Sequence, residues 1–476
     1  MVFSSLLFTF YFLPLTVLIY NLSKDRYKNA ILVVASLLFY AYGEPEYVFL
    51  MIGSIFFNYL LALLIDNRLE KDYVKSARLA LALDVCLNIG LLCVFKYLTY
   101  SLALVKTFSG AQFTIPGIRL PIGISFFTFQ AMSYCIDVYA RRVRAQKNPM
   151  YTALYISFFP QLIAGPIVRY NTIEEQILHR SVTSDDMAEG IRRFFLGFAK
   201  KVILANTLAD IAEEAFALES GINNPIFLWL GSIAFTLQIF YDFSGYSDMA
   251  IGLGRMFGFK FAENFNYPYI SRSVTEFWRR WHISLGTWFR DYVYIPLGGS
   301  RVSVPRNVLN LFIVWVLTGI WHGANVTFVI WGLFYFILLV IEKWILKPDN
   351  RNPVIKVIWQ MITLFAVNFA WVIFNSISIS TAINYIKGMI GLNGASPAID
   401  AAVLEVIYEY SPFLLAGLVF ATPVIPYIER KLDEIEKKGL RIVARLAQAS
   451  VYCFMFTWAV SSLILGHHNP FIYFNF

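Results

Sequence analysis

Two Trp-His pairs are the residues in this sequence best suited to chemistry: Trp281-His282 and Trp321-His322. The protein has only five histidines among 476 residues. Neutral imidazole is the usual side chain for removing a proton near neutral pH, and a hydroxyl that attacks a thioester needs such a base. Ionisable groups in a strongly apolar chain indicate a function by default. The alternative is that both histidines only bond to neighbouring carbonyl or carboxyl groups.

Four carboxylates lie near these histidines in the sequence: Asp242, Asp248, Glu276 and Asp291. One of them could orient a histidine by accepting a hydrogen bond from its second ring nitrogen. For Glu276 and Asp291 we favour pairing with the neighbouring arginines instead.

Arginines cluster around the first Trp-His pair. Arg279 and Arg280 precede it, and Arg290 follows it. Guanidinium groups bind phosphates through paired hydrogen bonds, so these three could hold the phosphates of a nucleotide-linked donor. They could equally anchor the chain at the cytoplasmic face, where Lys and Arg collect. The sequence leaves both interpretations open.

Several catalytic signatures do not occur in the sequence. There is no HExxH motif and no zinc-ligand spacing, so we predict no metal site. Without a GxSxG motif a serine-hydrolase site is not indicated, and without a Walker motif ATP-driven transport is not indicated either. The four cysteines include no CxxC pair, which favours small core residues over a disulfide.

The composition is that of a membrane protein. Hydrophobic residues make up 58% of the chain and charged residues 15%, against roughly 25% charged residues in soluble domains. Apolar runs long enough to cross a bilayer recur from end to end. The net charge of +8 fits the excess of Lys and Arg in cytoplasmic loops. Nucleic-acid binding would need a basic soluble face, and the sequence indicates none. We therefore predict an all-α, multi-pass membrane protein.

We predict about a dozen transmembrane and re-entrant helices in a single domain, residues 1–476. The first span covers 3–21 and the last covers 446–466. Because basic clusters mark the inner loops, both termini should lie on the outer side. Residues 158–170 are apolar but broken by Pro and Gly, which predicts a bent or re-entrant piece. Residues 191–216 look amphipathic and could lie in the interface.

The outer stretch 376–410 is a candidate surface for a partner. It contains Ile379, Ile383 and Ile386 at helical spacing. The same pattern fits a helix that lies on the bilayer, and both interpretations stand.

Long sequence blocks carry a family resemblance over essentially the whole chain. These blocks resemble the hallmark segments of the membrane-bound O-acyltransferases: YDFSGYSDMAIG (241–252), NFNYPY (264–269), EFWRRWHISLGTWFRDYVYIPLGG (276–299) and TGIWHGAN (318–325). The IPLGGSR block resembles the polysaccharide O-acetylation branch, which acetylates alginate and peptidoglycan. One departure is Val326, where many relatives have Trp, and this could alter the shape of the pocket.

The resemblance implies a ring of helices around a central funnel. In this family the histidine of the WHG block is catalytic, which here is His322, and His282 lines the same path. The residues that would support them are Asp242, Asp248, Trp281, Trp321 and Asn325.

The resemblance also implies the donor and the partners. Acetyl would enter from a cytoplasmic thioester, acetyl-CoA. This thioester would be a substrate, and the enzyme would have no bound cofactor. It would leave to an extracytoplasmic acceptor, commonly a partner acetyltransferase of the SGNH-hydrolase type or a carrier protein, and then to a glycan. The protein would lie in the bacterial cytoplasmic membrane. Two alternatives are a transporter or flippase of an envelope precursor, and D-alanyl transfer to teichoic acid.

The tail FIYFNF (471–476) contains Tyr473. Its aromatic residues could anchor the chain end at the bilayer interface. A phenol is also a nucleophile once a base removes its proton. The tail resembles the tyrosine-bearing C-terminus of the small accessory peptides in D-alanylation systems, so Tyr473 could be an acyl relay.

Overall fold

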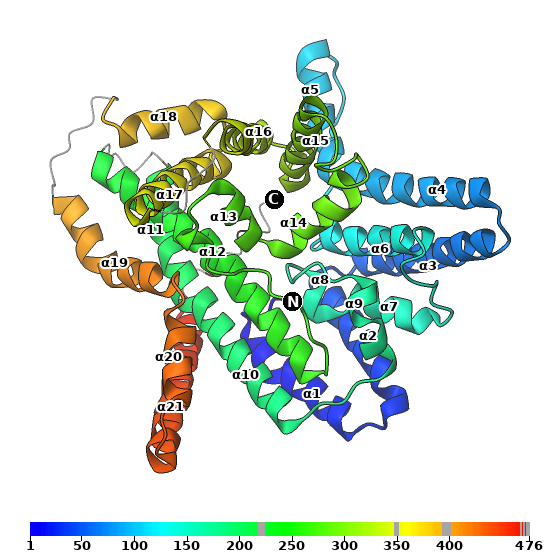
Figure 1. The fold of residues 1–476 in the computed structure, drawn as a ribbon, viewed down its shortest axis with the longest axis horizontal. Coiled ribbons are helices and arrows are strands. Elements are labelled where there is room, and N and C mark those ends of the chain that lie inside the picture. Colours follow the sequence, from blue (N-terminus) through cyan, green and yellow to red (C-terminus); the bar gives the residue numbers. More distant parts are fainter. Residues whose placement is uncertain (218–223, 347–351, 393–400, 467–468, 470–471, 473–476) are drawn as a thin grey trace. The chain divides into compact units, whose positions relative to one another are not determined.

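The structure is a computed structural model that describes residues 1–476 except 218–223, 347–351, 393–400, 467–468, 470–471 and 473–476. Every regular element in these described ranges is a helix, and they contain no strand (Figure 1). The prediction of an all-α protein is confirmed.

Eight helices or helical runs in the described ranges are long and apolar enough to cross a bilayer. They are α3 (Tyr47–Glu70), α4 with η2 and α5 (Val74–Leu92, Cys93–Tyr97, Leu98–Ser109), α12 (Pro225–Met256), α15 (Val304–His322), α16 with η6 (Val326–Ile341, Glu342–Leu346), α17 (Pro353–Asn375), α19 (Ala401–Phe420) and α21 (Lys438–Ile464). A shorter apolar helical run consists of η1 (Phe8–Phe12) and α1 (Leu13–Leu22). The multi-pass prediction is therefore confirmed.

Two further apolar helices do not meet these criteria. The helix α2 (Asp25–Gly43) begins with charged residues, and α6 (Ile124–Tyr139) has only 16 residues. Nearly every side chain of α6 is buried by protein.

The chain divides into two compact units. The first contains Met1–Phe194 and Met249–Ala262, and the second contains Phe195–Asp248 and Glu263–Phe476. Each unit has buried hydrophobic side chains of its own. That the whole chain acts as one domain stays a prediction.

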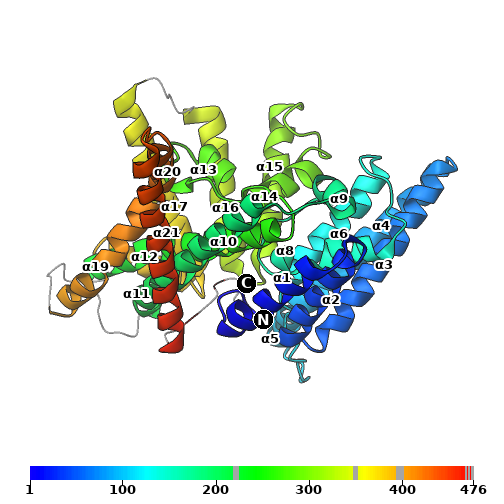
Figure 2. The same ribbon diagram turned by 90° about the horizontal axis from the view of Figure 1, so that it is seen from below.

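In the first unit, α3, α4 and α6 pack against one another (Figures 1 and 2). The helix α7 (Pro149–Ser157) packs on α2 and α3. Aromatic rings fill the space near the N-terminus, where Phe8 lies 5.7 Å from Phe39 and 6.1 Å from Phe159 between ring centroids.

The predicted break over 158–170 is present. A single helical turn, α8 (Phe159–Leu162), is followed by non-helical backbone up to α9 (Tyr170–Leu178). This backbone is buried, and protein groups satisfy it: Phe159 N donates to Ser36 Oγ at 3.0 Å, and the Tyr155 hydroxyl donates to Val168 O at 3.1 Å. Irregular backbone at membrane depth is tolerated only under such cover.

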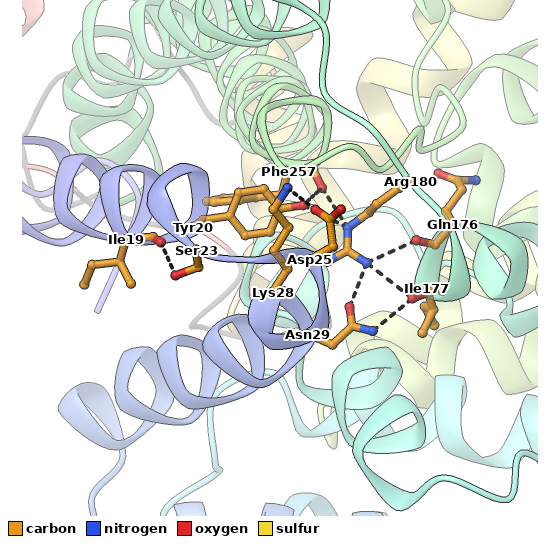
Figure 3. Close-up of polar contacts among 10 residues, drawn as sticks. All are labelled: Ile19, Tyr20, Ser23, Asp25, Lys28, Asn29, Gln176, Ile177, Arg180 and Phe257. Carbon is orange, nitrogen blue, oxygen red and sulfur yellow. Dashed lines mark hydrogen bonds and ion pairs between the residues drawn. The ribbon is translucent and has the colours of Figure 1, made fainter.

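Arg180 connects several segments of the first unit (Figure 3). Its guanidinium donates to the Tyr20 hydroxyl and to Phe257 O, both at 3.0 Å, and to Asn29 Oδ1 at 2.7 Å. It also lies 4.5 Å from the ring centroid of Phe259. One cation thereby links α1, α2, the end of α9 and the turn that follows α12.

In the second unit, α15 and α16 form a tight antiparallel pair. A Cβ atom on Gly319 would lie 2.5 Å from Phe328 O, and one on Gly332 would clash with Trp315 O. Glycine at both positions lets the two backbones approach closely, as small residues do between membrane helices. The turn of this pair directly follows His322.

Two short helices lie in an arc formed by α12, α17, α16 and α15 (Figure 1). They are α13 (Val274–Arg280) and α14 (Ile283–Phe289), which η5 (Arg290–Tyr294) follows. The Ser273 hydroxyl accepts from Glu276 N at 3.0 Å, and the Glu342 carboxylate accepts from Val274 N at 2.6 Å. These caps satisfy the first amides of α13 and fix it against η6.

Residues 191–216 differ from the prediction. They lie in α10 (Ser184–Ala199), η3 (Lys200–Ala205) and α11 (Asn206–Ala217), and Lys201–Ala205 are all buried. An interfacial helix is therefore wrong for the middle of this stretch.

The remaining helices are η4 (Pro268–Ile270), α18 (Ile379–Met389) and α20 (Val424–Asp433).

Candidate active site

His282 lies at the junction of α13 and α14, in a left-handed backbone conformation with φ 44° and ψ 54°. Such a conformation is costly for a residue with a side chain, and it occurs often at functional sites. Backbone bonds on both sides hold it: Asn266 N donates to Arg280 O, and Ile283 N donates to Asn264 O, both at 2.9 Å. The NFNYPY segment is thereby fastened to the RRWH segment.

The imidazole of His282 is 2% exposed. Its Nδ1 atom lies 3.2 Å from Asn264 Oδ1, and the Phe243 ring contacts it at 4.6 Å between centroids. Burial lowers the pKa of His282 to about 3, because the charged imidazolium loses its hydration. The ring is therefore neutral at physiological pH.

His322 is the last residue of α15 and is half-buried among aromatic rings. Its ring centroid lies 4.8 Å from Trp321, 5.0 Å from Trp331 and 5.1 Å from Phe374. The Trp321 ring also lies 6.2 Å from His282. One indole thus contacts both predicted histidines.

A cavity of about 510 Å³ opens beside His282. His282, Arg279, Arg290 and Thr318 line it, with aromatic and aliphatic side chains of α13, α14 and α15. Thr318 precedes His322 by four residues, so the two share a face of α15. The cavity combines a neutral imidazole with two cationic side chains, which suits a negatively charged ligand.

The three predicted arginines have different places. Arg279 and Arg290 line the cavity, whereas Arg280 is not among its lining residues. Arg280 forms an ion pair with Glu276 at 2.9 Å and donates to Asn266 O at 3.1 Å. Arg290 also pairs with Asp291 at 2.6 Å. The expected pairing of Glu276 and Asp291 with local arginines is confirmed.

The other two carboxylates are paired with lysines. Asp242 lies 2.6 Å from Lys201, and Asp248 lies 2.6 Å from Lys200. The oxygen beside His282 Nδ1 belongs instead to the amide of Asn264, which sequence reasoning missed. Its position in the NFNYPY block next to the RRWH block was the available signal.

A comparison with known families assigns the chain. Residues 18–385 match the model of MBOAT, the membrane-bound O-acyltransferase family. The chain belongs to the membrane-bound O-acyltransferase family. It is therefore an O-acyltransferase and a multi-pass membrane protein.

Three relatives illustrate the similarity. The "Probable alginate O-acetylase AlgI" of Pseudomonas aeruginosa is 44% identical over 386 residues, which cover 80% of this chain and 73% of that protein. The "Peptidoglycan O-acetyltransferase" of Helicobacter pylori is 36% identical, and the match covers 83% of this chain and 81% of that protein. The "Teichoic acid D-alanyltransferase" of Bacillus subtilis is 31% identical, and the match covers 53% of this chain and 68% of that protein.

Two further predicted residues have structural contacts in this O-acyltransferase. Trp281 packs on Trp371 at 4.9 Å and on Phe277 at 5.6 Å between centroids. Asn325 caps α16 by accepting from Thr327 N at 3.1 Å, and it donates to Ile377 O at 2.9 Å. Asn325 thereby links the turn after His322 to the turn after α17.

Tyr473 lies outside the described residues. The preceding residue, Ile472, is 7% exposed, and its N–H donates to Asp242 Oδ2 at 2.8 Å. Ile472 is thus buried by protein in the second unit, unlike a residue at the bilayer surface. Asp242 directly precedes Phe243, whose ring contacts His282.

No group of three His, Cys, Asp or Glu side chains gathers as metal ligands would within the described ranges. That the enzyme works without a metal stays a prediction.

Proposed function

We propose that this O-acyltransferase passes acetyl groups from a cytoplasmic thioester, acetyl-CoA, to an extracytoplasmic acceptor for polysaccharide O-acetylation in the bacterial cell envelope. The observation that carries the proposal is the cavity that joins the neutral His282 to Arg279 and Arg290. The similarity to proteins named for alginate and peptidoglycan O-acetylation covers 80% or more of the chain. The similarity to a D-alanyltransferase covers 53%.

In this proposal Arg279 and Arg290 hold the phosphates of the donor, because guanidinium groups bind phosphate oxygens well. Arg280 has a structural role, since Glu276 and a backbone carbonyl occupy its guanidinium. The acetyl thioester would extend past His282 along the face of α15 that carries Thr318 and His322.

We propose His322 as the general base and His282 as a second polar group on the same path. The base removes the proton of the attacking hydroxyl, whose oxygen forms a bond to the thioester carbonyl carbon. The carbon–sulfur bond then breaks, and the leaving thiolate takes up the proton. Trp321, in ring contact with both imidazoles, sets their spacing.

Tyr473 is our proposed first acceptor. Ile472 is held on Asp242, one residue from the Phe243 ring that contacts His282. Acetyl would pass to the tyrosine oxygen and then to a partner acetyltransferase of the SGNH-hydrolase type or a carrier.

The helix α18 is our proposed docking surface for that partner, with both chain termini on the outer side of the cytoplasmic membrane. Its buried face carries Ala382, Tyr385 and Met389. On the opposite face Ile383 is 47% exposed, and Ile377, just before the helix, is 82% exposed. Crosslinks from Ile383 to a secreted protein would support docking, and crosslinks to lipid alone would contradict it.

The proposal is tested with purified protein in proteoliposomes that contain acetyl-CoA. Acetyl transfer to an external glycan with the partner present is expected, and it should fall by about 100-fold or more in His322→Ala. Equal acetylation by wild type and His322→Ala would overturn the enzyme mechanism. Transfer of D-alanyl but not acetyl groups would show that the enzyme uses D-alanyl in place of acetyl.

A further inference from the structure

We infer that Asn264 is a positioning residue that fixes which ring nitrogen of His282 carries the proton. Both side chains are buried in the second unit, and His282 Nδ1 lies 3.2 Å from Asn264 Oδ1. The inference deepens the proposed function, because it rests on the part that His282 takes in acyl transfer.

A backbone donor fixes the orientation of the Asn264 amide. Ser284 N lies 3.1 Å from Oδ1, and Ser284 Oγ lies 2.8 Å from the same atom. A backbone N–H can only donate, so the atom that faces it must be the carbonyl oxygen. The reversed amide would place its NH₂ group against this N–H, which is a contact between two donors.

An amide oxygen only accepts hydrogen bonds, so it requires a proton on the nitrogen that faces it. His282 Nδ1 therefore donates to Asn264, and the neutral ring keeps its lone pair on Nε2. Nε2 is then the ring atom that can accept a proton or a hydrogen bond. With the opposite tautomer the same atom would be a donor.

The backbone holds this arrangement in place. Asn264 O accepts from Ile283 N, and Arg280 O accepts from Asn266 N, so hydrogen bonds flank the left-handed residue His282. Asn264 is fully buried, which makes its rearrangement costly.

Ser284 provides the competing donor. Its hydroxyl also lies 3.4 Å from His282 Nδ1, but Asn264 Oδ1 is its closer acceptor. Without that oxygen the hydroxyl can donate to Nδ1, and the ring proton then belongs on Nε2. Removal of Asn264 should therefore switch the tautomer as well as loosen the ring.

Nitrogen-15 NMR of the full-length, histidine-labelled protein in detergent micelles reads the tautomer directly. There are five histidines, and His282→Gln assigns the relevant signals. The expected state of the wild type is a proton on Nδ1. A proton on Nε2 in the wild type would overturn the inference.

The variant Asn264→Leu tests the cause of the tautomer. Its matched control is Asn368→Leu, because Asn368 is also buried and donates to Thr236 Oγ1 at 2.9 Å elsewhere in the same unit. We expect Asn264→Leu to move the proton to Nε2 and to lower acetyl transfer about 100-fold or more, as wrong tautomers do in hydrolases. Asn368→Leu should keep the Nδ1 proton.

The outcomes separate this inference from the proposed function. An Nδ1 proton retained in Asn264→Leu overturns the inference. A switched tautomer with full acetyl transfer supports the positioning role and overturns the role proposed for His282.

Asn264→Asp keeps the inference testable if Asn264→Leu does not fold. The aspartate retains an acceptor at Nδ1 and adds negative charge, which stabilises the imidazolium. An NMR titration should show a higher pKa for His282 than in the wild type. An unchanged pKa would show that the two side chains are not in direct contact.

Discussion

The Trp321 indole lies edge-on to the His282 imidazole, with 6.2 Å between the ring centroids, and directly precedes His322 in the chain. Because Trp321 is 5% exposed, its removal should leave a cavity beside both histidines. Trp321→Ala is expected to destabilise the protein by about 3–5 kcal/mol and to lower acetyl transfer more than tenfold. Trp321→Phe should retain most activity.

Trp371→Ala is the matched control for that experiment. Trp371 is 2% exposed and packs on Trp281 and Trp331. If the two alanine variants lose stability equally and Trp321→Ala keeps the activity of Trp371→Ala, the indole has no special role beside the histidines.

The arginines around His282 provide a second prediction. The double variant Arg279→Gln, Arg290→Gln should weaken acetyl-CoA binding at least tenfold, because it removes both cations that line the cavity. Isothermal titration with the purified protein measures this binding.

Arg280→Gln is the internal control, because its guanidinium is paired with Glu276 and does not line the cavity. Its expected effect on donor binding is less than threefold. A greater loss in Arg280→Gln than in the double variant would reverse the assignment of these arginines.

Sequence reasoning found these arginines but could not separate them. Arg279 and Arg280 are adjacent in α13, and successive residues on a helix point about 100° apart. Only the position of α13 against its neighbours decides which one faces the cavity. His282 and His322 were found because histidine is rare in this chain, whereas Asn264 was missed because backbone bonds between distant segments create its contact.

The fold, too, could be predicted from the sequence only where contacts between distant segments do not decide it. Hydropathy predicted the long spans, and Pro and Gly predicted the break over 158–170. The stretch 191–216 looked amphipathic because four basic residues, Lys201 among them, stand in it among apolar residues. In the structure Asp242, far away in the sequence, compensates its charge inside the second unit.

The pH dependence of stability follows from the lowered pKa of His282. This residue has a pKa of about 3 in the folded protein and about 6.5 in the unfolded chain. Between these values the unfolded chain binds one more proton, so acid favours unfolding. From pH 7 to one unit below the unfolded pKa, the free energy of unfolding should fall by about 1.3 kcal/mol through this residue.

Thermal unfolding of wild type and His282→Gln, at neutral pH and at one unit below the unfolded pKa, checks this loss of stability. The wild type should lose more stability on acidification than the variant, which has no imidazole at this position. Parallel losses in the two proteins would show that His282 is accessible to protons in the folded state.

The buried ion pair of Lys201 and Asp242 gives a fourth prediction. Both side chains are 2% exposed. Lys201→Met leaves the Asp242 carboxylate without its cation and should cost about 3–5 kcal/mol of stability. Lys200→Met should cost less, because Lys200 and Asp248 are 19% and 9% exposed. Equal losses of unfolding free energy in the two variants would contradict this account.

The final prediction concerns Tyr473 as an acyl relay. Tyr473→Phe keeps the aromatic ring and removes only the hydroxyl, so an anchoring role would survive and a relay would not. Acetylation of the external glycan should fall at least 100-fold, while donor binding through Arg279 and Arg290 stays intact. The matched control is Tyr408→Phe, since Tyr408 is 87% exposed on α19. Intact mass of the C-terminal peptide, after incubation with acetyl-CoA and without partner, should show one added acetyl group in the wild type only. A Tyr473→Phe protein that acetylates glycan at the wild-type rate would eliminate the relay and leave direct transfer from the thioester to the partner.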